Sequence, residues 1–323
     1  MSNIRYLSRN DVISLQLPMR DVINAVELAF VEKGHGRIEM PPKPGIHPLP
    51  DAFIHAMPAY IPSMKAVGVK WVSGFPQNMP KNLPYISGLL ILNDAETGIP
   101  LCVMDCTWIT GMRTGAATAV AAKYLAPPES KTVGILGCGV QGRCNLDAIK
   151  ETFPRCARLL AYDRNTKAAE ALCSDASSQW GFETKLCLNA AEACEDADII
   201  VTAAAILKDP SPVLERSWLK SRVFLSPVDF DSYIKPEIFK AADLFYTDDV
   251  AQQQYYRKIG YFKNIPEPQG DLGEILTHQK RGRNNTDKIT IAMNLGIALE
   301  DMATAALVYE SAVKANVGTL LPA

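Results

Sequence analysis

The chain has 323 residues, of which 48% are apolar and 21% are charged, a composition typical of globular proteins. That length is large for a single hydrophobic core and suits two domains. The formal net charge of -2 gives no reason to expect a nucleic acid partner, so a small, weakly charged ligand is the better expectation.

No run approaches the roughly 18 consecutive apolar residues that a membrane span requires, and residues 1–11 lack the apolar core of a signal peptide. These features predict a cytoplasmic protein with no membrane partner. The eight cysteines include no C-x-x-C pair, and the four histidines are widely spread. This distribution predicts reduced, structural thiols and no metal site, because metal ligands cluster.

The chain up to about residue 105 predicts a mixed sheet with one helix. Asn10 and Asp11 are expected to cap a first helix, and an apolar stripe at helical spacing over 19–33 ends before Gly34. Short apolar runs predict the strands, and 94–98 reads as a turn between two of them. The predicted strands are 53–57, 66–72, 86–93 and 101–104.

An alanine- and threonine-rich helix is predicted over 106–125, ending before the Pro127–Pro128 breaker. It carries Arg113, which is followed by Thr114 and other small residues. Small neighbours indicate close packing, and a packed guanidinium needs a carboxylate partner.

Residues 131–164 contain the features of a dinucleotide-binding βαβ unit in order. A short apolar run leads into a G-x-G-x-x-G sequence, and a helix follows it. The three glycines allow a tight turn, approach of a pyrophosphate to the backbone, and close helix packing. The helix start would direct its free N–H groups at the phosphates. The expected cofactor-binding residues here are Gly137, Gly139, Val140, Gln141 and Gly142.

Asp163 ends the next apolar run, about 20 residues after the last glycine, where the fingerprint expects an acid. A carboxylate there binds ribose hydroxyls and repels a 2′-phosphate, which favours NAD over NADP. Arg164 leaves NADP possible, because a basic residue at this place can hold the 2′-phosphate.

Further strands alternate with short helices, which predicts a doubly wound parallel sheet. These strands are expected at 184–188, 199–203, 223–228 and 244–246, with one helix over 167–174. A last strand at 289–292 precedes a helix over 296–315 that we expect to pack back on the N-terminal domain. The predicted fold is therefore α/β, with a Rossmann-type NAD-binding domain (126–295) and a discontinuous α+β substrate-binding and dimerisation domain (1–125 and 296–323).

Seven short motifs, taken in order, resemble the ornithine cyclodeaminase and mu-crystallin family, which includes archaeal-type alanine dehydrogenase. The resemblance covers nearly the whole chain. The motifs are Met40-Pro41-Pro42-Lys43, Ala56-Met57-Pro58, Gly68-Val69-Lys70-Trp71-Val72, Leu92-Asn93-Asp94 to Thr97-Gly98, Met112-Arg113-Thr114-Gly115-Ala116-Ala117, Gly137-Cys138-Gly139-Val140-Gln141 and Gly296-Ile297-Ala298-Leu299-Glu300-Asp301.

The resemblance implies a homodimer that binds NAD(P) in the Rossmann domain and a small amino, imino or keto acid in the cleft between domains. It implies that Lys70 sits beside the reacting carbon, that Arg113 grips the substrate carboxylate and that Lys43 assists it. From the residues alone, an ammonium in an apolar strand either faces a polar partner or points to solvent. Thr114 is expected to contact the cofactor.

The resemblance also implies an acid that transfers protons after a strand of the Rossmann sheet, and both Asp229 and Asp231 fit. Cyclodeaminases that act on ornithine carry a glutamate where this chain has His55, which argues against ornithine and makes His55 a candidate substrate contact. Asn294 stands near the expected place of the nicotinamide, where the family often has Asp-Ser.

The leading hypothesis is an NAD(P)-dependent amino acid dehydrogenase or imine reductase that transfers a hydride at the α-carbon. The alternatives are a cyclodeaminase with tightly held NAD and a non-catalytic binding protein like mu-crystallin that holds NADP and a small ligand. The lysine, the arginine and the aspartate pair argue against the last of these.

Overall fold

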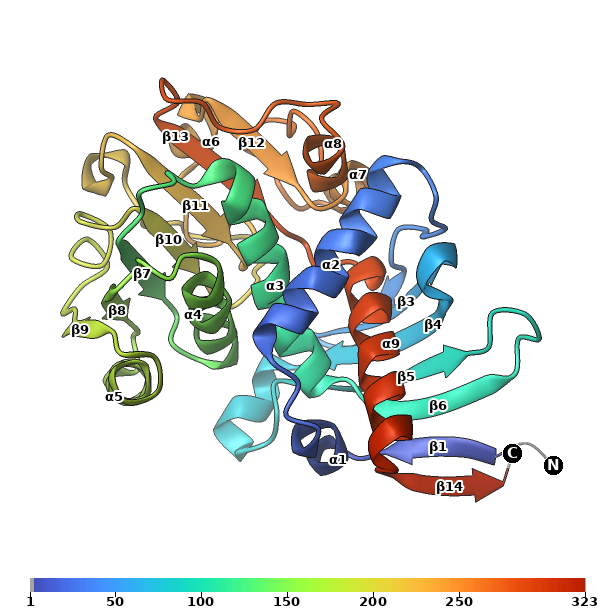
Figure 1. Ribbon diagram of the computed structural model, residues 1–323. Coiled ribbons are helices and arrows are strands. Elements are labelled where there is room, and N and C mark those ends of the chain that lie inside the picture. Colours follow the sequence, from blue (N-terminus) through green and yellow to red (C-terminus); the bar gives the residue numbers. More distant parts are fainter. Residues whose placement is uncertain (1–2, 323) are drawn as a thin grey trace. The chain divides into compact units, whose positions relative to one another are not determined.

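The computed structural model describes residues 3–322 and divides the chain into two compact units (Figure 1). Unit 1 comprises Met1–Arg113 and Gly296–Ala323, and unit 2 comprises Thr114–Leu295. Unit 1 is therefore discontinuous in sequence. No helix among residues 3–322 has the length and apolar character needed to cross a bilayer.

Unit 1 is built on a seven-stranded mixed sheet. Its neighbours pair antiparallel except β1 and β6, which pair in parallel. In spatial order the strands are β14 (Thr319–Pro322), β1 (Asn3–Leu7), β6 (Pro100–Asp105), β5 (Ile86–Asn93), β4 (Ala66–Gly74), β3 (Phe53–Ile61) and β2 (Gly45–Ile46).

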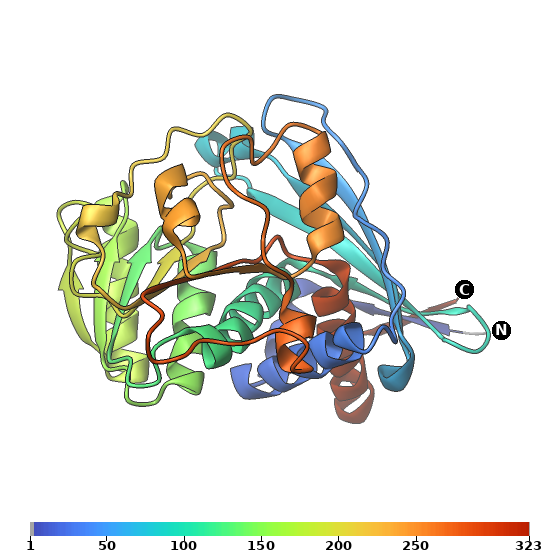
Figure 2. The ribbon, with the colours of Figure 1, turned by 90° about the horizontal axis from the view of Figure 1, so that it is seen from above.

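Two long helices cover one face of this sheet, as the two views in Figures 1 and 2 show. They are α2 (Met19–Gly34) and α9 (Ala298–Ala315), which contact each other, while α9 also contacts β3, β4 and β5. The C-terminal helix thus packs on the N-terminal sheet, as its apolar face predicted. Its first turns are fully buried.

The other elements of unit 1 are short. They are α1 (Arg9–Ser14), the 3₁₀ turns Pro62–Met64 and Pro76–Lys81, and the first residues of α3 (Thr107–Leu125), which continues into unit 2. The predicted cap of α1 was wrong. Ser8 is the N-cap, and Asp11 closes a capping box by accepting from the Ser8 backbone N–H. Asn10 lies inside the helix.

Strands β1 and β14 were not predicted from the sequence. Each is only a few residues long, and the two pair with each other across almost the whole length of the chain. A short strand with no turn signal beside it carries too little periodicity to be recognised. Such pairing of distant segments is set by tertiary structure.

Unit 2 contains a seven-stranded, all-parallel sheet, which confirms the predicted Rossmann-type fold. The last strand of unit 2 in chain order, β13, lies between β11 and β12. The spatial order is β12 (Leu244–Thr247), β13 (Ile289–Met293), β11 (Val223–Pro227), β10 (Ile199–Thr202), β7 (Thr132–Leu136), β8 (Arg158–Tyr162) and β9 (Glu183–Leu186).

The central strands β7, β10, β11 and β13 are buried along their whole length, as expected for a parallel sheet covered on both faces. The chain order reverses between β7 and β10, and ligands of such folds bind beyond the strand ends at this point. The helices of unit 2 are α4 (Val140–Thr152), α5 (Thr166–Trp180), α6 (Pro236–Ala241), α7 (Val250–Lys258) and α8 (Leu272–Leu276), with a 3₁₀ turn at Arg216–Trp218.

The compact units divide within α3, between Arg113 and Thr114, whereas the boundary predicted from the sequence lies after residue 125. The assignment of substrate binding to one domain and NAD binding to the other stays a prediction.

Candidate active site

Lys70 points into unit 1 and not to solvent. On β4 the side chains alternate, so that Trp71 is 51% exposed while Lys70 is 1% exposed. The Lys70 ammonium donates to Asp301 Oδ1 at 2.7 Å and lies 3.5 Å from Thr110 Oγ1. Burial lowers the pKa of Lys70, and the Asp301 carboxylate opposes that shift.

Arg113 lies between two carboxylates from the first turn of α9. Its Nη1 donates to Glu300 Oε2 at 2.7 Å, and its Nε forms an ion pair with Asp301 Oδ1 at 3.0 Å. Both carboxylates are 0% exposed. A packed guanidinium needs a carboxylate partner, and here the protein itself supplies two. These contacts fix the plane of the guanidinium.

Gly296 joins Lys43 to this group of charges. Lys43 Nζ donates to the Gly296 carbonyl at 2.7 Å. Gly296 has a φ of +72°, and a Cβ at this position would lie 2.3 Å from Arg113 Nη1. Only glycine therefore lets the backbone lie against the guanidinium. We call Lys43, Lys70, Arg113, Glu300 and Asp301 the charged cluster.

His55 lies on the same face of the sheet as Lys70, since β3 and β4 pair with His55 opposite Val72 and Met57 opposite Lys70. It is 8% exposed and stacks on Phe53, with ring centroids 4.3 Å apart. The pKa of His55 is lowered to about 2, mainly by burial. Electrostatic interactions with Lys43, His47 and Lys70 add to this shift. The imidazole is therefore neutral at physiological pH.

Sequence reasoning missed Glu300 and Asp301 as site residues. Both lie within the last of the seven motifs, but no role was predicted for either of them. The signal was present, because two adjacent carboxylates open a helix whose next two turns are mostly apolar, and buried acids require partners. Their partners lie about 190 and 230 residues earlier in the chain, which sequence spacing cannot reveal.

In unit 2, the glycine-rich loop has the geometry that its motif predicts. Gly137 has a φ of +101°, and a Cβ on Gly142 would lie 2.2 Å from the Gly137 carbonyl oxygen. In contrast, nothing lies within 4 Å of a Cβ built on Gly139, which is the N-cap of α4. The two outer glycines are required by the fold, and the middle one leaves open space in front of the helix.

Asp163 faces this loop. Its Oδ2 accepts from Cys138 N at 2.7 Å and its Oδ1 from Asn165 N at 2.8 Å, so its carboxylate has a fixed orientation beside the glycines. Arg164 and Val140 are exposed, whereas Thr114 and Asn294 are buried. Among residues 3–322, neither side-chain polar atom of Asn294 has a hydrogen-bond partner.

The two candidate proton-transfer residues have different environments. Asp229 is 0% exposed, and its oxygens accept from Thr202 Oγ1 at 2.5 Å and from Ala204 N at 3.0 Å. Burial raises the pKa of Asp229 to about 6, against these hydrogen bonds. Both of its oxygens are thus engaged in joining the ends of β10 and β11.

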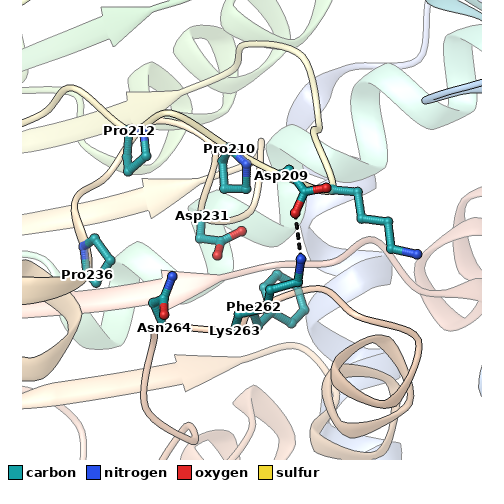
Figure 3. Close-up of a pocket in the computed structure, with 9 residues that line it drawn as sticks. Asp209, Pro210, Pro212, Asp231, Pro236, Phe262, Lys263 and Asn264 are labelled. Atoms are coloured by element: carbon teal, nitrogen blue, oxygen red, sulfur yellow. Dashed lines mark hydrogen bonds and ion pairs between the residues drawn. The ribbon is translucent and has the colours of Figure 1, made fainter.

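Asp231 lines a cavity of about 130 Å³ within unit 2. Figure 3 shows its carboxylate between Pro210 and Phe262, next to the ion pair of Asp209 with Lys263. Burial raises the pKa of Asp231. Its Oδ1 has no hydrogen-bond partner in the part of the chain that the structure describes. A buried oxygen of this kind can accept a proton or a ligand donor, which favours Asp231 over Asp229.

The eight cysteines are all present as free thiols. Within residues 3–322, no three His, Cys, Asp or Glu side chains gather as a metal site would require.

The model of the ornithine cyclodeaminase/mu-crystallin family matches residues 5–316. The chain belongs to this family. It is 34% identical over 322 residues to an alanine dehydrogenase of Archaeoglobus fulgidus, covering 97% of this chain and 96% of that one. The resemblance inferred from the motifs is thereby confirmed.

Two solved structures of this family are similar along their whole length. One is the Δ1-pyrroline-2-carboxylate reductase of Thermococcus litoralis in complex with NADH and L-proline, with a TM-score of 0.88 and 35% identity over 98% of this chain and 99% of that one. The other is an archaeal alanine dehydrogenase dimer with bound NAD, with a TM-score of 0.88 and 32% identity over 99% of each chain. Both of these relatives therefore bind NAD or NADH, and the reductase also binds an amino acid.

Proposed function

We propose that the chain is an NAD-dependent oxidoreductase that acts at the α-carbon of a small amino, imino or keto acid. The observation that carries this proposal is the charged cluster, in which three cationic and two acidic side chains are buried in one part of unit 1. Ionisable groups held in this way are costly for a fold and concentrate at functional sites.

The residues of unit 2 fit the dinucleotide. The open space at Gly139 admits a pyrophosphate, and α4 begins there without a side-chain cap, so that the positive end of the helix faces this space. The fixed carboxylate of Asp163 is suited to ribose hydroxyls and unsuited to a 2′-phosphate, which supports NAD over NADP. NAD, when bound, supplies the hydride acceptor of the oxidation. Thr114, Gln141 and Asn294 are further proposed contacts of the cofactor.

In unit 1, Arg113 and Lys43 would bind the substrate carboxylate. Glu300 and Asp301 hold the guanidinium in one orientation, so that binding a planar carboxylate needs little further ordering. Lys70 lies next to Arg113 through their shared partner Asp301. Its lowered pKa suits proton exchange with the α-amino or imino group.

Asp231 is the proposed proton-transfer group of unit 2, since its Oδ1 is buried and faces a cavity. Asp229 is assigned a structural role, because Thr202 and Ala204 occupy both of its oxygens. The matched variants Asp231→Asn and Asp229→Asn separate the two assignments. We expect the first to lower kcat at unchanged thermal stability and the second to lower the melting temperature.

A homodimer is proposed on the basis of the outer face of the unit 1 sheet. Trp71, Leu89 and Ile91 are exposed there by 51%, 44% and 36%, and Trp71 is the direct cross-strand partner of Leu89. Contiguous apolar surface of this kind marks an interface. In the two views, no helix of the described part of unit 1 covers this face (Figures 1 and 2).

The proposed function is tested by incubating the purified protein with NAD or NADH and a panel of amino, keto and cyclic imino acids while following nicotinamide absorbance. We expect a change in absorbance with at least one small acid, and its loss in Lys70→Met. Release of ammonia from ornithine without net NADH formation would instead indicate a cyclodeaminase. Cofactor binding without turnover of any acid would contradict the proposal.

A further inference from the structure

Phe230 stands between the two aspartates that follow β11, and its backbone is left-handed. Its φ is +64°, which is rare for a bulky residue. Ser232 N donates to the Asp229 carbonyl at 3.2 Å, so residues 229–232 form a turn with Phe230 in its second position. A positive φ at the second position and not at the third is the pattern of a type II′ turn, which favours glycine.

The Phe230 side chain is held by three aromatic rings from later in the chain. It is 3% exposed. Its ring centroid lies 5.3 Å from that of Phe262, 5.5 Å from that of Tyr256 and 6.2 Å from that of Tyr261. We call these three residues the ring cluster. A strained backbone position persists only where its surroundings fix it, and the ring cluster provides contacts that do so.

The residues on both sides of Asp231 are anchored, whereas its own carboxylate is not. Both oxygens of Asp229 accept hydrogen bonds from the end of β10 and the segment after it, and Ser232 Oγ accepts from Leu207 N at 3.1 Å. Asp231 Oδ1 has no hydrogen-bond partner among residues 3–322. Its side chain lines the cavity, as does Phe262 of the ring cluster (Figure 3). The position of this carboxylate therefore depends on the backbone of the turn.

We infer that Phe230 is a positioning residue, whose ring, clamped by the ring cluster, holds the left-handed turn that directs the Asp231 carboxylate into the cavity. Phe230 has no polar side-chain atom and acts through Asp231. The inference rests on the proposed function, in which Asp231 transfers the proton. A displacement of about 1 Å at a reacting group can lower a rate on the order of 100-fold, so the fixing of this turn matters for catalysis.

The first test compares Phe230→Leu with Phe239→Leu. Leucine at position 230 loses the ring contacts but does not remove the strain, so the turn can relax. Phe239 is the matched control, because it is 1% exposed in the same hydrophobic core and packs on the ring of Phe245 at 5.2 Å. We expect both variants to lower the melting temperature, and only Phe230→Leu to lower kcat, by about tenfold or more. Equal kcat values for the two variants would overturn the inference.

The second test makes the same replacement in a protein that lacks the Asp231 carboxylate. Phe230→Leu should lower kcat in the wild-type background and have almost no effect in the Asp231→Asn background, because the two residues act as one unit. An equal fold-change in both backgrounds would show that Phe230 has only a general structural role.

Titration of the Asp231 carboxyl group separates this inference from the proposed function. Its carbon resonance is followed by NMR and assigned by its absence in Asp231→Asn. Burial raises the pKa of Asp231, so in Phe230→Leu the pKa should fall towards its ordinary value as the carboxyl gains access to water. The charged groups around it are the same in both proteins, namely Asp229, Arg257, Lys208, Asp209 and Lys263.

An unchanged pKa of Asp231 in Phe230→Leu would overturn the inference, whether or not the protein oxidises any acid. A lowered pKa, together with an unchanged kcat in Asp231→Asn, would support the positioning of the carboxylate and contradict only the proposed proton transfer. Tyr256→Leu is the second variant if Phe230→Leu does not fold, since it removes one ring of the cluster and leaves the turn sequence intact. The same fall in the pKa of Asp231 is expected there, and its absence would overturn the inference.

Discussion

Two glycines of one loop are required for different reasons, although they lie only three positions apart. Gly142 is needed by the fold, since a Cβ there would collide with the Gly137 carbonyl. Gly139 has an ordinary φ of -76° and open space in front of it. The lack of a side chain at position 139 is therefore explained by space for a ligand and not by packing within the protein.

Gly139→Val should therefore abolish NAD binding and leave the melting temperature nearly unchanged, because the new side chain occupies only the pyrophosphate position. Gly142→Val is the contrasting variant and should lower the melting temperature strongly. Calorimetric titration with NAD and thermal unfolding of both variants provide the measurement. Undiminished NAD affinity in Gly139→Val would remove this loop from the cofactor site.

The neutral state of His55 makes the stability of the protein depend on pH. The pKa of His55 is about 2 in the folded protein and about 6.5 when unfolded. Between these values only the unfolded chain binds the proton. The stabilising contribution is thus complete above about pH 6.5 and is lost as the pH falls, by up to about 1.4 kcal/mol per pH unit.

His55→Gln should flatten this dependence. Chemical denaturation of wild type and variant between about pH 4 and 6 measures the slope, which should be smaller in the variant. The exposed His35 provides the control, and His35→Gln should retain the wild-type slope. Equal slopes for wild type and His55→Gln would show that His55 titrates alike in the folded and unfolded states.

At the scale of elements, the first turn of α9 supplies the carboxylates that pair with two candidate functional side chains on other elements. It places Asp301 against Lys70 of β4 and, with Glu300, against Arg113 of α3. The sequence identified the lysine and the arginine through their motifs. It could not identify what holds them, because the contacts join the two separated segments of unit 1.

Asp301→Asn should shift the pH dependence of carboxylate binding. Protonated Lys70 attracts the carboxylate of the substrate. The affinity for the substrate is therefore high at pH values below the pKa of Lys70 and falls at pH values above it. Removing Asp301 removes the group that opposes the lowering of this pKa by burial, so the loss should begin at lower pH. Titration of a keto acid such as pyruvate against the NADH-loaded protein across the alkaline range measures this.

The exposed Glu96 offers a control for that experiment, because Glu96→Gln also removes a carboxylate of unit 1 that pairs with a lysine. It should leave the pH profile unchanged. A profile of Asp301→Asn that coincides with wild type would mean that Asp301 does not govern the protonation of Lys70.

At the scale of the whole molecule, the order of the elements along the chain could be predicted from the sequence. The complete order of the strands within each sheet could not. The glycine motif and the alternation of strands and helices predicted the parallel sheet, and the structure and the family match confirm it. The sequence did not reveal that β13 enters between β11 and β12, or that β14 completes the unit 1 sheet. Both depend on pairing between segments far apart in the chain.

Self-association through the outer face of the unit 1 sheet gives a further prediction. Trp71→Glu places a charge among exposed apolar side chains and should convert a dimer into a monomer. Val313→Glu is matched to it, because Val313 is also apolar and 46% exposed but lies on α9. Light scattering after gel filtration should show the dimer in wild type and Val313→Glu only. A dimeric Trp71→Glu protein would exclude this face as the interface.

The most direct test of the proposed enzyme is the oxidation of a small monocarboxylic amino acid with NAD by wild type and by Arg113→Lys. The variant keeps the charge and loses the two-pronged contact, worth roughly 1.5–3 kcal/mol for a charged hydrogen bond. We predict NADH formation by wild type, a fall in kcat/KM of about 10- to 150-fold in the variant, and nearly unchanged NAD affinity. Wild-type kinetics in Arg113→Lys, or no NADH formation with any carboxylated substrate, would contradict the account.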